Sequence, residues 1–182
     1  MKEISIKAKL GDNKERVVFG LDKKGAKSKK GKEELEKIFV KSDVENLNLA
    51  PGDNLIKLKQ EENKVILSLN QKSNVPGKDI IVESLVSDEE EITKIINLIG
   101  FKEIVKINKK RTKYVLSDFY INLDYIDGLD YFIEIKKLYD EAKESEENAY
   151  DSAKELMFDL GLNENDFVFG SYEELKFKNE NK

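Results

Sequence analysis

The side chains that could do chemistry in this 182-residue chain are carboxylates, amines, guanidiniums and hydroxyls. The sequence contains no cysteine and no histidine, so it lacks thiolates, disulfides and the most common general base. Carboxylate oxygens favour hard cations such as Mg²⁺ or Mn²⁺ over Zn²⁺. Clustered lysines and arginines favour anions, phosphates above all. The positions of these charges along the chain therefore decide which chemistry is open to it.

Residues 104–136 carry the densest pattern of such charges, and their alternation predicts three consecutive strands. In a strand, alternate residues share one face, so each charged set lies opposite an apolar set. The sets that share the charged face are Lys109, Arg111 and Lys113, then Tyr120, Asn122 and Asp124, then Phe132, Glu134 and Lys136 after the turn Asp127–Gly128. A face with dense charge of both signs suits an anion together with a metal ion.

Five further segments read as strands that would complete an antiparallel sheet of about eight strands. They are residues 2–10, 37–43, 55–60, 64–70 and 79–86. In the first, Ile4, Ile6, Ala8 and Leu10 alternate with polar residues. The Pro51–Gly52 pair predicts a turn within the loop 44–54. The segments 55–60 and 64–70 predict a hairpin joined by residues 61–63.

Helices are predicted where apolar residues recur at helical spacing. Residues 88–100 have isoleucines at 92, 95, 96 and 99, which we expect to be buried, with Asp88 as N-cap and Gly100 as terminator. Residues 149–160 carry a second apolar stripe, and residues 13–21 are compatible with a short helix. Ser171 and Glu174 form a capping-box pattern for a last short helix, after which residues 179–182 are predicted to fray.

The segment 22–36 is rich in lysine, glycine and serine and has no clear periodicity. It has two interpretations. The simpler one is a mobile, solvated loop, which such composition favours. The functional one is a flap whose lysines attract phosphate.

If the sheet closes or curls, its charged faces point into one interior. Those faces carry Glu3, Ser5, Lys7, Lys57, Lys59, Glu83, Lys109, Arg111, Asp124, Glu134 and Lys136. Buried charges are costly unless they are paired or bind a ligand, so such an interior suits a polyphosphate with a divalent cation. The alternative is an open sheet whose polar face meets water.

Composition limits the classes of partner. The formal net charge of −5 argues against general nucleic-acid binding. No apolar run approaches the roughly 20 residues of a membrane span, and the first residues lack a signal-peptide core, so a cytosolic location is expected. The length predicts one domain over residues 1–182, with a partly frayed tail from residue 170.

The order of short motifs along the chain resembles the CYTH superfamily, and within it the class IV adenylyl cyclases. The resemblance covers nearly the whole chain and is strongest over residues 97–136. An ExExK-like strand reads Glu3-Ile4-Ser5-Ile6-Lys7, and an LRIR-like strand reads Ile56-Lys57-Leu58-Lys59. The later motifs are Leu98-Ile99-Gly100-Phe101, Lys109-Lys110-Arg111, Leu123-Asp124, Ile126-Asp127-Gly128-Leu129-Asp130, Phe132-Ile133-Glu134-Ile135-Lys136, residues 160–162 and Ser171-Tyr172-Glu173-Glu174-Leu175.

This resemblance implies an α+β fold, a closed eight-stranded antiparallel tunnel with helices outside. It implies that a nucleoside triphosphate or polyphosphate binds inside with Mg²⁺ or Mn²⁺. Carried over by position, the phosphate ligands are Lys7, Lys57, Lys59, Lys109 and Arg111, with Lys109 and Arg111 also catalytic, and the metal ligands are Glu3, Glu83, Asp124 and Glu134. The implied activity is an adenylyl cyclase or a triphosphatase, and the resemblance is compatible with a homodimer.

Five positions depart from the family pattern. Ser5 and Lys136 replace acids, Asn70 replaces a lysine, and Asp79 and Ile81 stand where an arginine and a glutamate are usual. Lys136 would place an ammonium near the expected cation, and like charges repel. Either Lys136 substitutes for a metal charge and still holds phosphate, or the metal site is lost and the chain is a non-catalytic binding module.

Overall fold

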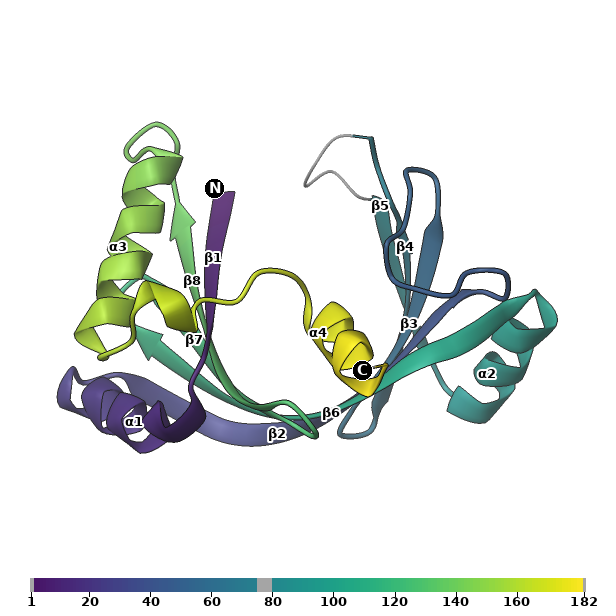
Figure 1. Cartoon of the computed structure of the whole chain (residues 1–182), viewed down its shortest axis with the longest axis horizontal. Helices are drawn as coiled ribbons and strands as arrows, with labels where there is room; N and C mark the ends of the chain where they lie inside the picture. The colour runs from purple at the N-terminus through teal and green to yellow at the C-terminus, as the bar shows by residue number, and fades with distance from the viewer. Residues whose placement is uncertain (1, 75–79, 182) are drawn as a thin grey trace. The chain divides into compact units, whose positions relative to one another are not determined.

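A computed structural model describes residues 2–74 and 80–181 (Figure 1). Its strands form one eight-stranded sheet in the order β1-β8-β7-β6-β2-β3-β4-β5. The strands are β1 (Lys2–Lys9), β2 (Lys27–Lys41), β3 (Asn54–Glu61), β4 (Lys64–Gln71), β5 (Ile80–Val86), β6 (Phe101–Leu116), β7 (Phe119–Ile126) and β8 (Asp130–Tyr139). The helices are α1 (Lys14–Lys23), α2 (Glu89–Leu98), α3 (Glu146–Asp159) and α4 (Tyr172–Glu180), with 3-10 turns η1 (Gly11–Asn13) and η2 (Glu164–Asp166).

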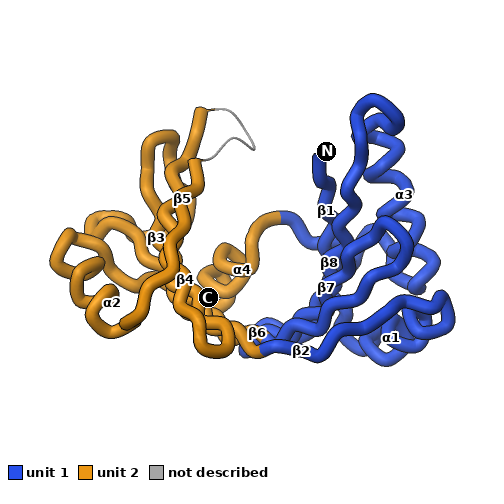
Figure 2. The backbone as a smooth tube through the Cα atoms, turned by 180° about the vertical axis from the view of Figure 1, so that it is seen from behind, with its two compact units in different colours: residues 1–32, 110–169 blue, residues 33–109, 170–182 orange. Residues whose placement is uncertain are grey.

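The predicted antiparallel sheet with helices is confirmed, but its closure into a barrel is not. The described pairings β1–β8, β2–β3, β3–β4, β4–β5 and β7–β8 are all antiparallel. In the strand order, β1 and β5 are the first and last strands. The chain divides into two compact units (Figure 2). Unit 1 is residues 1–32 and 110–169, and unit 2 is residues 33–109 and 170–182.

Unit 1 buries the apolar faces of its strands against α3 and α1. Alternation along β1 buries Ile4, Ile6 and Ala8, as predicted, and the stripe of α3 packs on them. Ser145 begins α3 by accepting a hydrogen bond from the Asn148 backbone N–H. In Figure 1, α3 runs alongside β1 and β8. The opposite, polar faces of these strands are therefore the ones left to bind a ligand.

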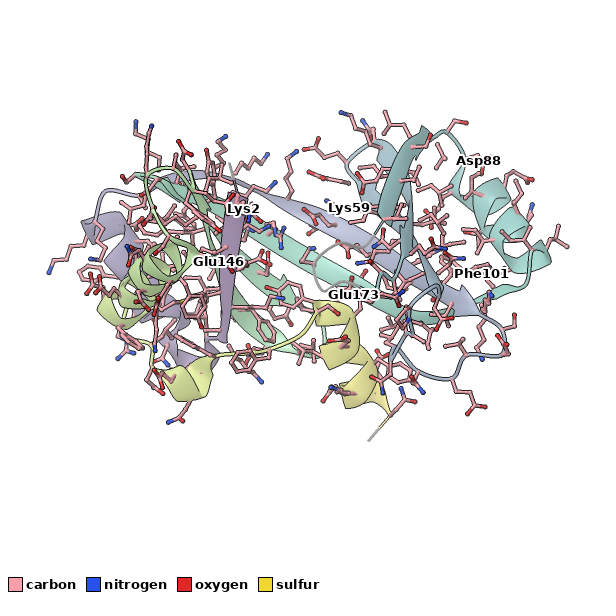
Figure 3. The ribbon with its side chains drawn as sticks, turned by 90° about the horizontal axis from the view of Figure 1, so that it is seen from above. Lys2, Lys59, Asp88, Phe101, Glu146 and Glu173 are labelled. Carbon is pink, nitrogen blue, oxygen red and sulfur yellow. The ribbon has the colours of Figure 1, made fainter. Side chains whose placement is uncertain are left out.

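Unit 2 has two smaller apolar clusters, one on each face of its strands. Phe39, Ile56 and Leu58 lie under α2, whereas Ile38, Val40 and Val105 lie under the segment around Leu47 and beside Phe177 of α4. Asp88 caps α2 as predicted, accepting a hydrogen bond from the Glu91 backbone N–H. Asp88 and Phe101, which flank this helix in the sequence, are labelled in Figure 3.

The prediction that all four isoleucines of α2 are buried is wrong for two of them. Ile96 is 2% exposed and Ile92 packs on the cluster, but Ile95 is 51% exposed and Ile99 is also exposed. These pairs form neighbouring ridges of the helix, and only the ridge of Ile92 and Ile96 contacts the sheet. Periodicity alone does not show how much of a helix's apolar face the sheet covers.

This difference makes Ile96 and Ile95 a matched pair. We expect Ile96→Ala to lower the free energy of unfolding by about 2–5 kcal/mol, because it leaves a cavity in the core. Ile95→Ala removes the same atoms from a half-exposed site and should cost about 1 kcal/mol or less. Urea unfolding of both variants measures the two costs. Equal costs would contradict this orientation of α2.

Two local predictions are corrected and one falls outside the described residues. The basic segment 22–36 is not a loop throughout, since β2 begins at Lys27. The first residues of β2 are exposed and lack alternation, so this part of the strand depends on its neighbours in the sheet. At Gly31 a Cβ would lie 3.2 Å from Thr112 Oγ1, which shows how closely the neighbouring strand approaches. The C-terminal helix extends to Glu180 rather than fraying from residue 179. Asp79, predicted at the start of a strand, lies outside the described residues.

Candidate functional site

The polar faces of the sheet carry two clusters of charged side chains, one in each unit. In unit 1, Arg111 of β6 pairs with Asp124 of β7, which is fully buried. Arg111 Nε lies 2.7 Å from Asp124 Oδ1, and its Nη2 lies 2.6 Å from Oδ2. This bidentate geometry fixes the guanidinium more firmly than a single hydrogen bond would. The structure thus joins one predicted phosphate ligand to one predicted metal ligand.

Glu134 of β8 is the second acid of this cluster. Asn122 Nδ2 donates to its Oε2 at 2.9 Å, Ser5 Oγ donates to its Oε1 at 3.1 Å, and Arg111 Nη2 is 3.8 Å away. Burial alone would raise the pKa of Glu134. The bond from Asn122 and the positive charges of Lys136, Arg111 and Lys7 outweigh burial and lower that pKa, so the group stays ionised.

The predicted metal ligand Glu3 and the predicted phosphate ligand Lys7 lie on β1, at the edge of this cluster. Lys136 Nζ lies 2.8 Å from Glu3 Oε1. The ladder places Lys7 opposite Glu134 and Ser5 opposite Lys136. Ser5 and Lys136, the departures from the family pattern, are therefore neighbours, and the predicted metal ligand Glu3 is paired with an ammonium.

In unit 2, the predicted phosphate ligands Lys59 and Lys109 share one buried carboxylate. Glu34 Oε2 lies 3.3 Å from Lys59 Nζ and 3.0 Å from Lys109 Nζ. Glu36 lies 2.9 Å from Lys109, and Glu61 lies 3.1 Å from Lys59. Lys109 is only 6% exposed. The two ammonium groups thus already have anionic partners.

The third predicted lysine of unit 2, Lys57, pairs with Glu173 of α4. Figure 3 labels Glu173 on this helix and Lys59 on β3. Ser171 caps the helix through the predicted capping box with Glu174. Burial alone would raise the pKa of Glu173, but Lys57, through its charge and hydrogen bond, lowers that pKa overall. The C-terminal helix thereby supplies a carboxylate to a predicted phosphate ligand.

This lowered pKa predicts how stability responds to acid. The carboxylate's stabilisation is complete above its ordinary pKa of 4.5 and is lost as pH falls through the lower folded-state value. We expect Glu173→Gln to be less stable than the wild type by about 1–3 kcal/mol at pH 7. The difference should shrink below pH 4. Urea unfolding from pH 7 to pH 3 measures it, with the exposed Glu180→Gln as control, and a difference that does not change with pH would contradict the ion pair.

The last predicted metal ligand, Glu83 of β5, is exposed and lies opposite Ser68 in the ladder. Among the residues that the structure describes, no three acidic side chains are grouped so that they could hold a metal ion. Asp124, Glu134 and Glu3 are instead bonded to cations or amides of the protein. As placed here, the predicted metal ligands do not form a metal centre.

Four acids that contact the predicted lysines were not among the predicted site residues: Glu34, Glu36, Glu61 and Glu173. Glu34 and Glu36 are alternate residues that β2 places on one face, but the predicted loop or flap over residues 22–36 gives no such alternation. Glu173 contacts Lys57 across 116 residues of sequence, and no local pattern reports such a contact.

Comparison with known proteins identifies the family. The CYTH domain family matches residues 1–172, so the chain belongs to that family. It is 26% identical over 180 residues to the "Putative adenylate cyclase MJ0240" of Methanocaldococcus jannaschii, covering 97% of this chain and 99% of that protein. Both predictions, of the superfamily and of the likeness to adenylate cyclases, are confirmed.

Solved structures share the fold. The PH1012 protein of Pyrococcus horikoshii superposes with a TM-score of 0.73 at 20% identity, covering 96% of this chain and 99% of that one. The Hippeastrum "Putative adenylyl cyclase HpAC1", described as revealing a dominant triphosphatase activity, gives 0.65 at 13% identity, covering 98% and 95%. No helix among the described residues is long and apolar enough to span a membrane.

Proposed function

We propose that this protein binds a nucleoside triphosphate through the cations on the polar faces of its sheet and converts ATP to cyclic AMP and pyrophosphate. The observation that carries the proposal is that Lys109 is buried and Arg111 is partly buried, two residues apart on β6. Buried ion pairs add little net stability compared with apolar residues, so a function other than stability favours their presence. The family resemblance assigns Lys7, Lys57 and Lys59 to further phosphate oxygens.

The chemistry asked of these residues is charge stabilisation. In a cyclisation, the ribose 3′ oxygen attacks the α-phosphorus, and the bond to the leaving pyrophosphate breaks. Lys109 and Arg111 would stabilise the negative charge that develops on the phosphate oxygens and on that leaving group. Asp124 holds the Arg111 guanidinium in place through two hydrogen bonds before substrate arrives, whereas Glu34, paired with Lys109, competes with the incoming phosphate.

The proposal also includes a closed tunnel, a cytosolic location, a homodimer and a divalent cation. Closure of the sheet into a tunnel, the cytosolic location and a homodimer rest on the resemblance and on composition. A divalent cation would enter as a partner of the triphosphate oxygens, which are hard ligands for Mg²⁺ or Mn²⁺. Glu3, Asp124 and Glu134 are bonded to cations or amides of the protein and Glu83 is exposed, so these acids do not act as metal ligands in the proposed reaction.

A binding and turnover experiment tests the proposal. Thermal unfolding is measured with ATP and with tripolyphosphate, each with and without Mg²⁺ or Mn²⁺, and reaction products are then identified. A ligand at 100 times its Kd raises stability by about 2.7 kcal/mol. Cyclic AMP with pyrophosphate supports the cyclase, and release of phosphate supports a triphosphatase. The absence of any shift with either ligand would sink the proposal.

A non-catalytic binding module is the second candidate, and the Glu3–Lys136 pair favours it. A lysine neutralises the acid that a metal site would need. The double change Ser5→Glu with Lys136→Glu restores the family pattern. Increased metal-dependent turnover would mean that the site has degenerated, and decreased turnover would mean that Lys136 belongs to a working variant. Robust product from the unmodified protein at low concentration rules this candidate out.

A further inference from the structure

A cavity of about 390 Å³ lies over the polar face of unit 1. Its volume is within the range of small-molecule sites. All of its lining residues belong to unit 1. They include four cations, Lys29, Arg111, Lys113 and Lys136, and two tyrosines, the buried Tyr114 and the half-exposed Tyr120.

Two of these cations have no partner within the described part of the chain. Arg111 and Lys136 are bonded to Asp124 and Glu3. Lys29 and Lys113 are exposed and make no hydrogen bond or ion pair there. The cavity therefore has positive charge to offer to an anion without first displacing a carboxylate of the protein. This distinguishes it from Lys57, Lys59 and Lys109 of unit 2, each of which already faces an acid.

Tyr120 gives the same cavity a flat apolar surface. It lies opposite Lys136 in the β7–β8 ladder and is 48% exposed, and its side chain makes no ring contact or hydrogen bond within the described residues. A half-exposed ring beside cations is suited to a ligand that joins a planar group to phosphates, because the base stacks on the ring while its phosphates meet the ammonium groups.

We propose that this cavity binds the base and a neighbouring phosphate of a nucleoside triphosphate, with the base stacked on Tyr120 and the phosphate held by Lys113 and Lys29. The inference rests on the proposed function and adds a preference of the site for one class of triphosphate. The ligand is an organic triphosphate rather than inorganic tripolyphosphate, since only the former has a group for Tyr120 to contact.

Isothermal titration with ATP and with tripolyphosphate, both with Mg²⁺, tests this. Tyr120→Ala should lower the affinity for ATP roughly tenfold and leave that for tripolyphosphate unchanged, because one base–ring stack is lost. Tyr120→Phe keeps the ring and should retain wild-type affinity for ATP. Lys113→Ala should weaken both ligands. Phe19→Ala, at an exposed ring outside the cavity, is the matched control and should change neither.

The outcomes separate this inference from the proposed function. Wild-type protein that binds neither ligand overturns both. Wild-type protein that binds both, with Tyr120→Ala affecting the two equally or not at all, overturns only the base site. A loss in Tyr120→Phe as large as in Tyr120→Ala assigns the effect to the hydroxyl and overturns stacking. A Lys113→Ala variant with unchanged affinities overturns the placement of phosphate in this cavity.

Discussion

Arg111→Ala is expected to lower the free energy of unfolding by about 3–5 kcal/mol, because it leaves the buried carboxylate of Asp124 without its bidentate guanidinium. The same change removes a cation next to Glu134, whose lowered pKa depends partly on Arg111. A single substitution therefore removes the cationic partner of Asp124 and one of the positive charges near Glu134. Urea unfolding at pH 7 measures the loss.

Two further variants show whether geometry or charge carries this effect. Arg111→Lys keeps the positive charge but cannot form two parallel hydrogen bonds to Asp124, so we expect an intermediate loss. The double change Arg111→Ala with Asp124→Asn removes both charges and should recover part of the stability. If the double variant is as unstable as the sum of the single variants, the pair is not coupled and this account of the cluster is wrong.

The fold was largely predictable because its strands alternate. In β1, β3 and β6–β8 one face is apolar and the other is charged, so pattern alone located these strands and separated their faces. The early part of β2 was not predictable, since Lys27–Gly31 are all exposed and carry no alternation. A strand that is stabilised by its neighbours' backbone leaves no hydrophobic signal in its own sequence.

The sequence predicts which lysines and arginines lie in the candidate site, but not which acids they pair with. Alternation put Lys109 and Arg111 on one face, and the structure shows both as partly or fully buried. Which acid meets which cation depends on register and on contacts between distant segments, as with Lys57 and Glu173. Two of the acids that motif position marks as metal ligands, Glu3 and Asp124, are counter-ions of Lys136 and Arg111 in the structure. Charge balance within a cluster requires the full three-dimensional arrangement.

Glu34→Gln is expected to lower stability and yet raise the affinity for a triphosphate. The Glu34 side chain is 1% exposed and bridges Lys59 and Lys109, while Glu36 and Glu61 also contact these lysines. Three carboxylates thus surround two ammonium groups, and an incoming phosphate must compete with them. Neutralising the most buried acid costs about 3 kcal/mol of folding stability but removes the strongest competitor.

We expect the affinity of Glu34→Gln for tripolyphosphate with Mg²⁺ to rise about tenfold, which corresponds to about 1.4 kcal/mol. Titration calorimetry measures it, and urea unfolding measures the loss of stability. Glu61→Gln is the matched control, because its more exposed side chain contacts only Lys59 of the two lysines and is more strongly screened by solvent. A Glu34→Gln protein that loses affinity and stability together would mean that Glu34 orients the lysines for phosphate rather than competing with it.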